Sequence, residues 1–91
     1  MPFIRVLRWD PWNVNHIATH GVTIEEVEEV CNGTFISRLG HSGRLMIIGP
    51  TGAGRMLSVI LEETDEDSYY VVTARLASRR ERRIYVEEEG Q

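Results

Sequence analysis

Residues 35–61 read FISRLGHSGRLMIIGPTGAGRMLSVIL and alternate short apolar runs with glycine-rich spacers. A further run, rich in β-branched residues, follows after an acidic spacer. Runs of this kind joined by short spacers predict strands connected as hairpins, and therefore an antiparallel meander. The four predicted strands are Phe35–Leu39, Arg44–Ile48, Arg55–Leu61 and Tyr69–Thr73.

Helix start signals flank this meander on both sides. An aspartate followed by proline caps a helix well, because proline at the first helical position gives up no needed N–H group. The S/T-x-x-E pattern is a capping box, in which side chain and backbone satisfy each other's hydrogen bonds. Three helices are therefore predicted, after Asp10-Pro11, Thr23-Ile-Glu-Glu26 and Ser78-Arg-Arg-Glu81.

The ends of these helices and one more strand complete the predicted order. Gly21 ends the first helix, Asn32-Gly33 ends the second, and the third runs to about Glu88. Residues 3–9 have the branched and aromatic content of a strand. The order is strand, two helices, four strands, helix. We expect one α+β domain over residues 1–91, with two layers: an antiparallel sheet and helices packed on one side of it.

Charge is unevenly spread along the chain. Fourteen acidic residues against ten basic ones give a net charge of −4, which argues against a broadly cationic nucleic-acid coat. All ten basic residues are arginine, and five of them fall within residues 75–83. These counts predict a local cationic site on an acidic body.

Cysteine content and hydropathy bear on location. A single cysteine, Cys31, cannot form an internal disulfide, as expected in a reducing compartment. No stretch approaches the ~20 apolar residues that a bilayer span needs, and the N-terminus shows no signal-peptide pattern. We therefore expect a cytoplasmic protein without membrane contacts.

Two motifs suggest cofactors but fail on their context. Gly49–Met56 follows the spacing of a phosphate-binding loop, yet Arg55 and Met56 replace its lysine and hydroxyl residue. That loop must also lead into a helix, whereas a strand follows here, so we expect a hairpin turn.

A metal site on the first helix is similarly incomplete. Asn13, His16 and His20 are predicted to share one helical face, but the two histidines lack a third protein ligand. His20 can equally complement the helix dipole. Cys31 falls on the apolar stripe of the second helix and is expected to be packed. We predict neither a metal nor a cofactor.

The arginine-rich segment 75–85 is the strongest candidate site. Arg75 ends the last predicted strand, and Arg79 and Arg80 lie in the first helical turn, where positive charge opposes the helix dipole. This arrangement costs stability and points to an anion or a partner bound there. One face of the helix can present a carboxylate, a guanidinium and a phenol: Glu81, Arg82 and Tyr85.

Such a set of groups suits RNA cleavage without a metal. The 2′-hydroxyl needs a base, the phosphorane needs cations, and the leaving oxygen needs an acid. Arginine suits the second role because its planar fork pairs two phosphate oxygens. The hypothesis assigns phosphate binding to Arg75, Arg79 and Arg82, the base to Glu81 or His20, and positioning or proton transfer to Tyr85.

The residues at both ends of the chain resemble those of a known family. Trp9-Asp10-Pro11, Asn15, His20-Gly21-Val22-Thr23 and Glu25-Glu26 look like the W-D-x…N…K-H-G-V-[ST]-x-E-E opening of BrnT-type toxins. Gly54-Arg55-Met56-Leu57 and Val72–Tyr85 match that family's G-R-x-L…I-S-A-R-K-A-x-x-x-E-R-x-x-Y ending. The chain departs from the pattern at Thr19 and Leu76, where the family has lysine.

This resemblance implies the toxin of a type II toxin–antitoxin pair, with a RelE-like α+β fold and ribonuclease activity. The partner would be a small DNA-binding antitoxin, through which alone the complex would contact operator DNA. The motif positions that the chain matches are His20, Arg55, Arg75, Glu81, Arg82 and Tyr85.

Two other functions compete with the toxin hypothesis. The first is a non-catalytic interaction module whose arginine face binds an acidic protein partner or binds RNA without cleaving it. The second is a general RNA-binding domain, which usually requires exposed stacking aromatics. We expect Trp9, Trp12, Phe35 and the tyrosines to be packed instead, which disfavours the second.

Overall fold

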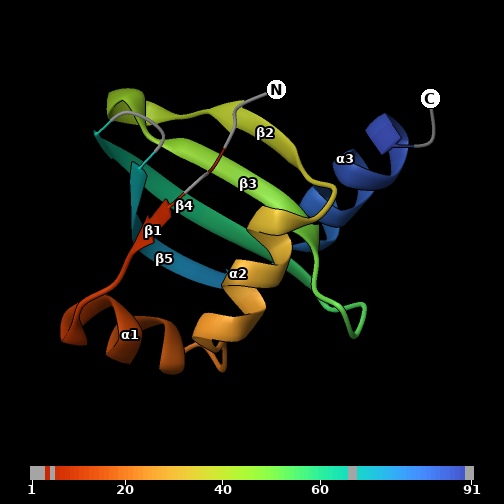
Figure 1. Ribbon diagram of the computed structural model, residues 1–91. Helices are drawn as coiled ribbons and strands as arrows, with labels where there is room; N and C mark the ends of the chain where they lie inside the picture. Colours follow the sequence, from red (N-terminus) through yellow and green to blue (C-terminus); the bar gives the residue numbers. More distant parts are fainter. Residues whose placement is uncertain (1–3, 5, 66–67, 90–91) are drawn as a thin grey trace.

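The computed structural model describes residues 4, 6–65 and 68–89, and its ribbon is shown in Figure 1. One strand is followed by two helices and then by four strands, with a short 3-10 turn after the first of the four. A final helix ends the described chain. The elements are β1 (Val6–Arg8), α1 (Pro11–Ala18), α2 (Ile24–Asn32), β2 (Ile36–Leu39), η1 (His41–Gly43), β3 (Leu45–Pro50), β4 (Met56–Asp65), β5 (Ser68–Leu76) and α3 (Arg79–Glu89).

The strands form one five-stranded sheet in the order β1-β5-β4-β3-β2. Neighbours from β2 to β5 are antiparallel, which confirms the predicted meander. β1 pairs with β5 in parallel, so the prediction of a wholly antiparallel sheet was wrong and the sheet is mixed. The reason is the chain path: α1 and α2 carry the chain from one edge to the other, and the meander returns β5 alongside β1 in the same direction.

Helices cover both faces of the sheet, which corrects the prediction that they lie on one side. α1 packs on β5 and α2 on β3 and β4, while α3 packs on β2 and β3 (Figure 1). Residues alternate between the faces, so neighbours such as Ile47 and Ile48 in β3 belong to different apolar clusters. Because both faces are apolar there, each requires a cover.

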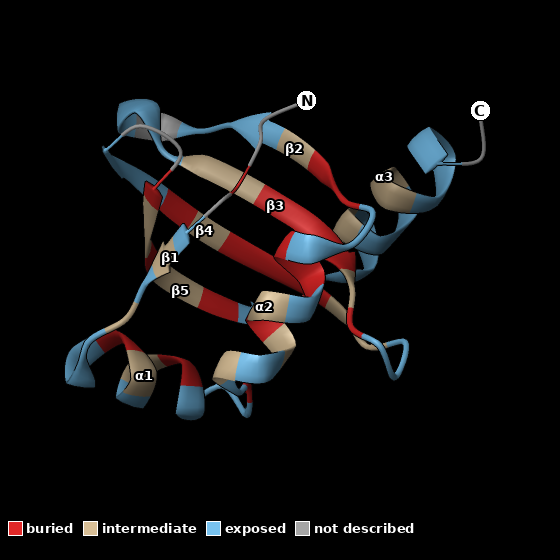
Figure 2. Ribbon diagram, in the orientation of Figure 1, coloured by how far each residue is buried: buried red, intermediate tan, exposed pale blue. Residues whose placement is uncertain are grey.

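The larger cluster lies between the sheet and the pair α1 and α2, and Figure 2 shows buried residues in red on these helices and on the strands beneath them. Its buried members are Ile4, Ile17, Val22, Val27, Val30, Cys31, Phe35, Ile47, Leu57, Val59, Leu61, Val71 and Ala74. The smaller cluster lies under α3, where Ile84 and Tyr85 pack against Ile36, Ile48 and Ala77.

Helix starts agree with the sequence. Capping boxes open α1 at Asp10 and α2 at Thr23. The third is formed by Ser78 and Glu81, as predicted. α1 ends at Ala18, three residues before Gly21, which has a φ of 72° and completes the turn that follows the helix. The agreement arises because these side-chain-to-backbone hydrogen bonds join residues within one helical turn and do not depend on the rest of the fold.

Strand bounds differ more. β4 runs to Asp65 and β5 to Leu76, so part of the predicted acidic spacer is strand. Residues 66 and 67 of that spacer, and residues 3 and 5 of the first predicted strand, lie outside the described residues. The glycine-rich segment between β3 and β4 is a hairpin turn, with Gly54 at a φ of 88°, as expected.

No helix within the described ranges has the length and apolar character that crossing a membrane requires.

Candidate functional site

The candidate site is centred on the junction where β5 ends and α3 begins. Arg75 donates from Nη1 to Oε1 of Glu81 at 2.9 Å and from Nη2 to Oε2 at 3.0 Å. The backbone N–H of Ser78 also donates to Glu81 Oε1, at 2.8 Å. The capping box therefore holds the carboxylate, and the carboxylate in turn orients the guanidinium in a two-pronged pair.

This pair sets the charge state of both side chains. Burial alone would raise the pKa of Glu81, but the hydrogen bonds from Arg75 and Ser78 outweigh it and leave that pKa below its ordinary value. The hydrogen bond to Glu81 raises the pKa of Arg75. Glu81 is thus ionised at neutral pH and a weaker base than an ordinary carboxylate, with both of its oxygens already occupied.

Within the described residues, the arginines of α3 form no ion pair with a carboxylate. Elsewhere in the described chain, Arg8, Arg38, Arg44, Arg55 and Arg75 each form an ion pair. Arg82 donates to the carbonyl of Ala77 at 3.3 Å. Among the described residues, none ion-pairs with the arginines of α3, which are Arg79, Arg80, Arg82 and Arg83 and are all exposed.

Arg55 lies beside this junction but faces the other helices. It enters β4 next to the end of β5, because the N–H of Ala77 donates to the carbonyl of Met56 at 2.9 Å. Its guanidinium pairs with Glu26 at 2.6 Å and donates to the carbonyl of Gly21 at 3.3 Å. Arg55 therefore ties the first turn of α2 to the sheet, and its charge is compensated.

His20 and Tyr85 lie on opposite faces of the sheet. His20 follows α1 and is exposed, and its ring meets that of His16 edge-on at 5.3 Å between centroids. Tyr85 lies on α3, and its hydroxyl donates to the carbonyl of Thr34 at 3.2 Å. Burial, and then the nearby Glu89, raise the pKa of Tyr85.

The structure thus brings together only part of the predicted site. Arg75, Glu81 and Arg82 meet at the junction, with Arg79 in the adjoining first turn of α3. Arg55 adjoins them from the side of α2. His20 lies beyond Arg55, and the Tyr85 hydroxyl points to the segment before β2.

Two neighbouring residues of α1 differ from their predictions. Asn13 was expected on the histidine face, but it is fully buried, and its Nδ2 donates to the carbonyls of Arg8 and Val71 at 3.0 Å each. Trp12 was expected to be packed, but it is 60% exposed. The helix docks by its Asn13 side, which turns Trp12 outward. The side-chain polarity of Trp12 and Asn13 predicts the reverse, because the orientation of α1 depends on its contacts with β1 and β5.

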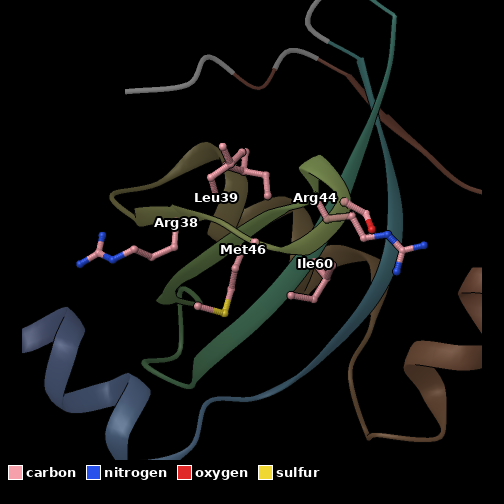
Figure 3. A pocket seen from close by; sticks show the side chains of 8 residues that line it. Arg38, Leu39, Arg44, Met46 and Ile60 are labelled. Carbon is pink, nitrogen blue, oxygen red and sulfur yellow. The ribbon is translucent and has the colours of Figure 1, made fainter.

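Away from the junction, the sheet face that carries α3 has a hollow of about 340 Å³. Figure 3 shows Met46 and Ile60 at its centre, with Arg38 and Arg44 extending to opposite sides. Both arginines are ion-paired, with Glu88 and Glu62 respectively. The hollow is therefore apolar with compensated charge at its rim, and it offers no reactive group.

Cys31 is buried as predicted, and burial followed by the charge of Glu28 raises its pKa to about 12. It is therefore a packed thiol. Over residues 4, 6–65 and 68–89, no three His, Cys, Asp or Glu side chains are grouped so as to hold a metal ion.

Comparison with protein-family models, with curated proteins and with solved structures gave no match to this chain. The resemblance to BrnT-type toxins therefore stays a prediction based on the motifs.

Proposed function

We propose that this chain is the ribonuclease toxin of a type II toxin–antitoxin pair, of BrnT type and RelE-like, acting on mRNA in the cytoplasm. A small DNA-binding antitoxin would neutralise it and would alone contact operator DNA. The observation that carries the proposal is the cluster of exposed arginines on α3 that have no ion-pair partner among the described residues, beside the Arg75–Glu81 pair. In a chain of net charge −4, four arginines gathered in the first two turns of one helix, without an ion-pair partner among the described residues, are best explained by a polyanionic ligand.

The proposed chemistry follows from where these charges lie. The 2′-hydroxyl of RNA attacks the adjacent phosphorus, and the 5′-oxygen leaves, which produces a cyclic phosphate and a free 5′-hydroxyl. Arg79, Arg80 and Arg82 would stabilise the negative charge of the phosphorane. Free amides of the first turn of α3 would add to this attraction.

The proton transfers have two candidate bases, Glu81 and His20. Glu81 lies among the arginines, but Arg75 and Ser78 occupy its oxygens, so it must exchange a hydrogen bond before accepting a proton. His20 is exposed and uses none of its ring nitrogens in a hydrogen bond within the described residues, but it lies beyond Arg55. Tyr85 would help by positioning, since its hydroxyl is bonded to Thr34.

The second candidate, a non-catalytic module that binds an acidic protein partner, is favoured by a specific observation. Both carboxylate oxygens of Glu81 already accept hydrogen bonds from Arg75, and the pKa of Glu81 is lowered rather than raised. An efficient general base at neutral pH has a pKa nearer 7. In this alternative, Glu81 only orders Arg75 and the helix start.

The first test measures cleavage and binding of a labelled mRNA by the purified chain. Replacing Arg79 and Arg80 by glutamine should slow cleavage at least tenfold and should lower the salt slope of log affinity by about 1.4, at about 0.7 per phosphate contact. The matched control replaces Arg8 and Arg44, which removes the same charge from arginines that are ion-paired. Equal effects of the two double variants, or RNA that stays intact with the unmodified chain, would refute the proposal.

The role of Glu81 is tested by Glu81→Gln, which keeps a hydrogen-bond acceptor for Arg75. If Glu81 is the base, cleavage should fall by a factor of about 10²–10⁴, whereas a positioning role leaves most of the activity. These variants and Arg75→Ala are then expressed in cells, with and without the gene that lies next to the gene for this chain. Growth arrest by the unmodified chain, relieved by Arg75→Ala or by the neighbouring gene, is the expected result.

A further inference from the structure

Three aromatic rings form a ladder along the outer side of α1. Trp12 and His16 are four residues apart, which places them on one face of α1, and His20 follows in the turn after the helix. The rings of Trp12 and His16 are parallel, with an interplanar angle of 6° and 4.9 Å between centroids. His20 then meets His16 edge-on, at 5.3 Å. Figures 1 and 2 show this helix on the outside of the sheet with its outer side exposed.

Trp12 is the open end of this ladder. It is 60% exposed, the largest aromatic surface that the structure leaves in solvent among the described residues. One ring face is covered by His16, and a free face of an indole is an efficient stacking surface. No packing requirement explains its position, because Asn13 and Ile17 make the buried contacts of this helix.

A shallow hollow of about 250 Å³ adjoins the ladder. Its lining combines rings with small polar side chains, namely Trp12, Asn15, His16 and Thr19. The Thr19 hydroxyl donates to the carbonyl of His16 at 2.6 Å, which secures the last turn of the helix. The exposed Asn15 amide has both a donor and an acceptor, so it can bond to a polar group of a ligand held against the rings.

The segment that carries the ladder has neither acidic residues nor arginines, so it does not repel a polyanion. Residues 11–24 contain no aspartate or glutamate, although the chain as a whole has fourteen acidic residues. The end of the ladder also leads toward the arginine cluster, because Gly21, next to His20, accepts the hydrogen bond from Arg55. Arg55 in turn lies beside the β5–α3 junction.

We propose that Trp12, supported by His16, stacks a base of single-stranded RNA whose phosphates extend toward α3. This inference rests on the proposed function insofar as RNA is the ligand, but it uses residues that the catalytic hypothesis does not. Stacking on aromatic side chains tolerates every base, so the ladder would position RNA without choosing its sequence.

The test measures binding of a ten-nucleotide 2′-O-methyl oligoadenylate, which lacks the attacking hydroxyl and so cannot be cleaved by this route. Trp12→Leu should weaken binding roughly 5- to 150-fold, as the loss of one stacked base does, whereas Trp12→Phe should retain most of the affinity. An abasic oligomer with the same phosphates should bind all three proteins equally. Leu39→Ala is the matched control, since Leu39 is 79% exposed on the opposite edge of the molecule. Unchanged melting temperatures would show that each variant folds.

The outcomes separate this inference from the ribonuclease proposal. If mRNA is cleaved but Trp12→Leu binds the oligoadenylate as tightly as the unmodified chain, the ladder inference is overturned and the proposed function stands. If Trp12→Leu loses affinity while no RNA is cleaved, the ladder stands and the ribonuclease proposal fails. If neither the unmodified chain nor any variant binds the oligoadenylate, the ladder inference is overturned. It is also overturned if Trp12→Leu weakens binding of the antitoxin but not of RNA.

Discussion

Adjacent residues can exchange the roles that their chemistry suggests, as Trp12 and Asn13 do in α1. The amide of Asn13 is buried because the start of α1 lies across the ends of β1 and the middle of β5. There it donates to the carbonyls of Arg8 and Val71, which would otherwise lack a partner from this helix. Asn13 also accepts from the N–H of Asp10, so a single side chain joins the helix start to both strands.

Asn13→Ala should therefore lower the free energy of unfolding by about 2–3 kcal/mol, because the buried carbonyl of Val71 and the partly buried carbonyl of Arg8 both lose this donor. Urea unfolding monitored by circular dichroism measures the change. Asn15→Ala is the control: Asn15 is exposed on the same helix, and its loss should change stability by no more than about 0.5 kcal/mol. Equal stability of the two variants would contradict the bridging role of Asn13.

At the scale of the element, α3 combines favourable and unfavourable features. Its capping box and the Arg75–Glu81 pair fix its first turn, and Ile84 and Tyr85 pack on the sheet. No residue of α3 is fully buried, so its attachment is weaker than that of α1 and α2. Arg79 and Arg80 nevertheless place positive charge at the end of the helix where the dipole favours negative charge.

Reversing that charge should separate stability from function. Arg80→Glu should raise the free energy of unfolding by about 0.3–1 kcal/mol, since an acid in the first turn complements the dipole. The same variant should bind RNA more weakly. Arg83→Glu makes the same charge change one turn later, so we expect weaker RNA binding there without the gain in stability. Thermal unfolding and an RNA titration test both statements, and a destabilised Arg80→Glu would contradict the first.

The whole molecule is a sheet whose two apolar faces are covered unequally. α1 and α2 enclose the larger cluster, and Cys31 lies within it, whereas α3 covers only part of the other face. Access to Cys31 thus requires the separation of α2 from the sheet. Because that packing includes residues from most of the described chain, we expect it to be lost only when the molecule unfolds as a unit.

The reactivity of the Cys31 thiol measures how often α2 separates from the sheet. With a pKa raised to about 12, it carries little thiolate at pH 8, and burial blocks reagents as well. Its modification by a disulfide reagent should be slow in native buffer and should accelerate along the urea unfolding curve. A Thr19→Cys variant supplies an exposed thiol in the same molecule, which should react at once. Similar native rates for both thiols would show that α2 opens locally.

Much of the secondary structure was predictable because its signals are local. Asp10, Thr23 and Ser78 satisfy backbone groups within three residues of themselves, so these N-caps can be recognised without any tertiary contact, although the capping box of Asp10 with Asn13 was not predicted. The apolar runs likewise predicted the meander from β2 to β5. Their exact ends were less predictable, since β4 continues through acidic residues that pair with β5.

The candidate site was predictable as a composition but not as a geometry. The arginines of 75–83 and Glu81 stand out in the sequence alone. The ion pairs of Arg75 with Glu81 and of Arg55 with Glu26 depend on how the strands and helices pack together. The exposure of Trp12 has the same origin, because periodicity places residues on helical faces but does not say which face docks.

The start of each helix, the four strands of the meander and the arginine-rich segment can all be recognised in the amino-acid sequence. Three other features follow from tertiary contacts: the parallel pairing of β1, the place of α3 on the face opposite α1 and α2, and the choice of which arginines form ion pairs among the described residues. The two groups of features differ in how far apart in the sequence the interacting residues lie. Caps and strand periodicity act within a few residues, whereas ion pairs and face selection depend on surfaces that meet only when distant segments fold together.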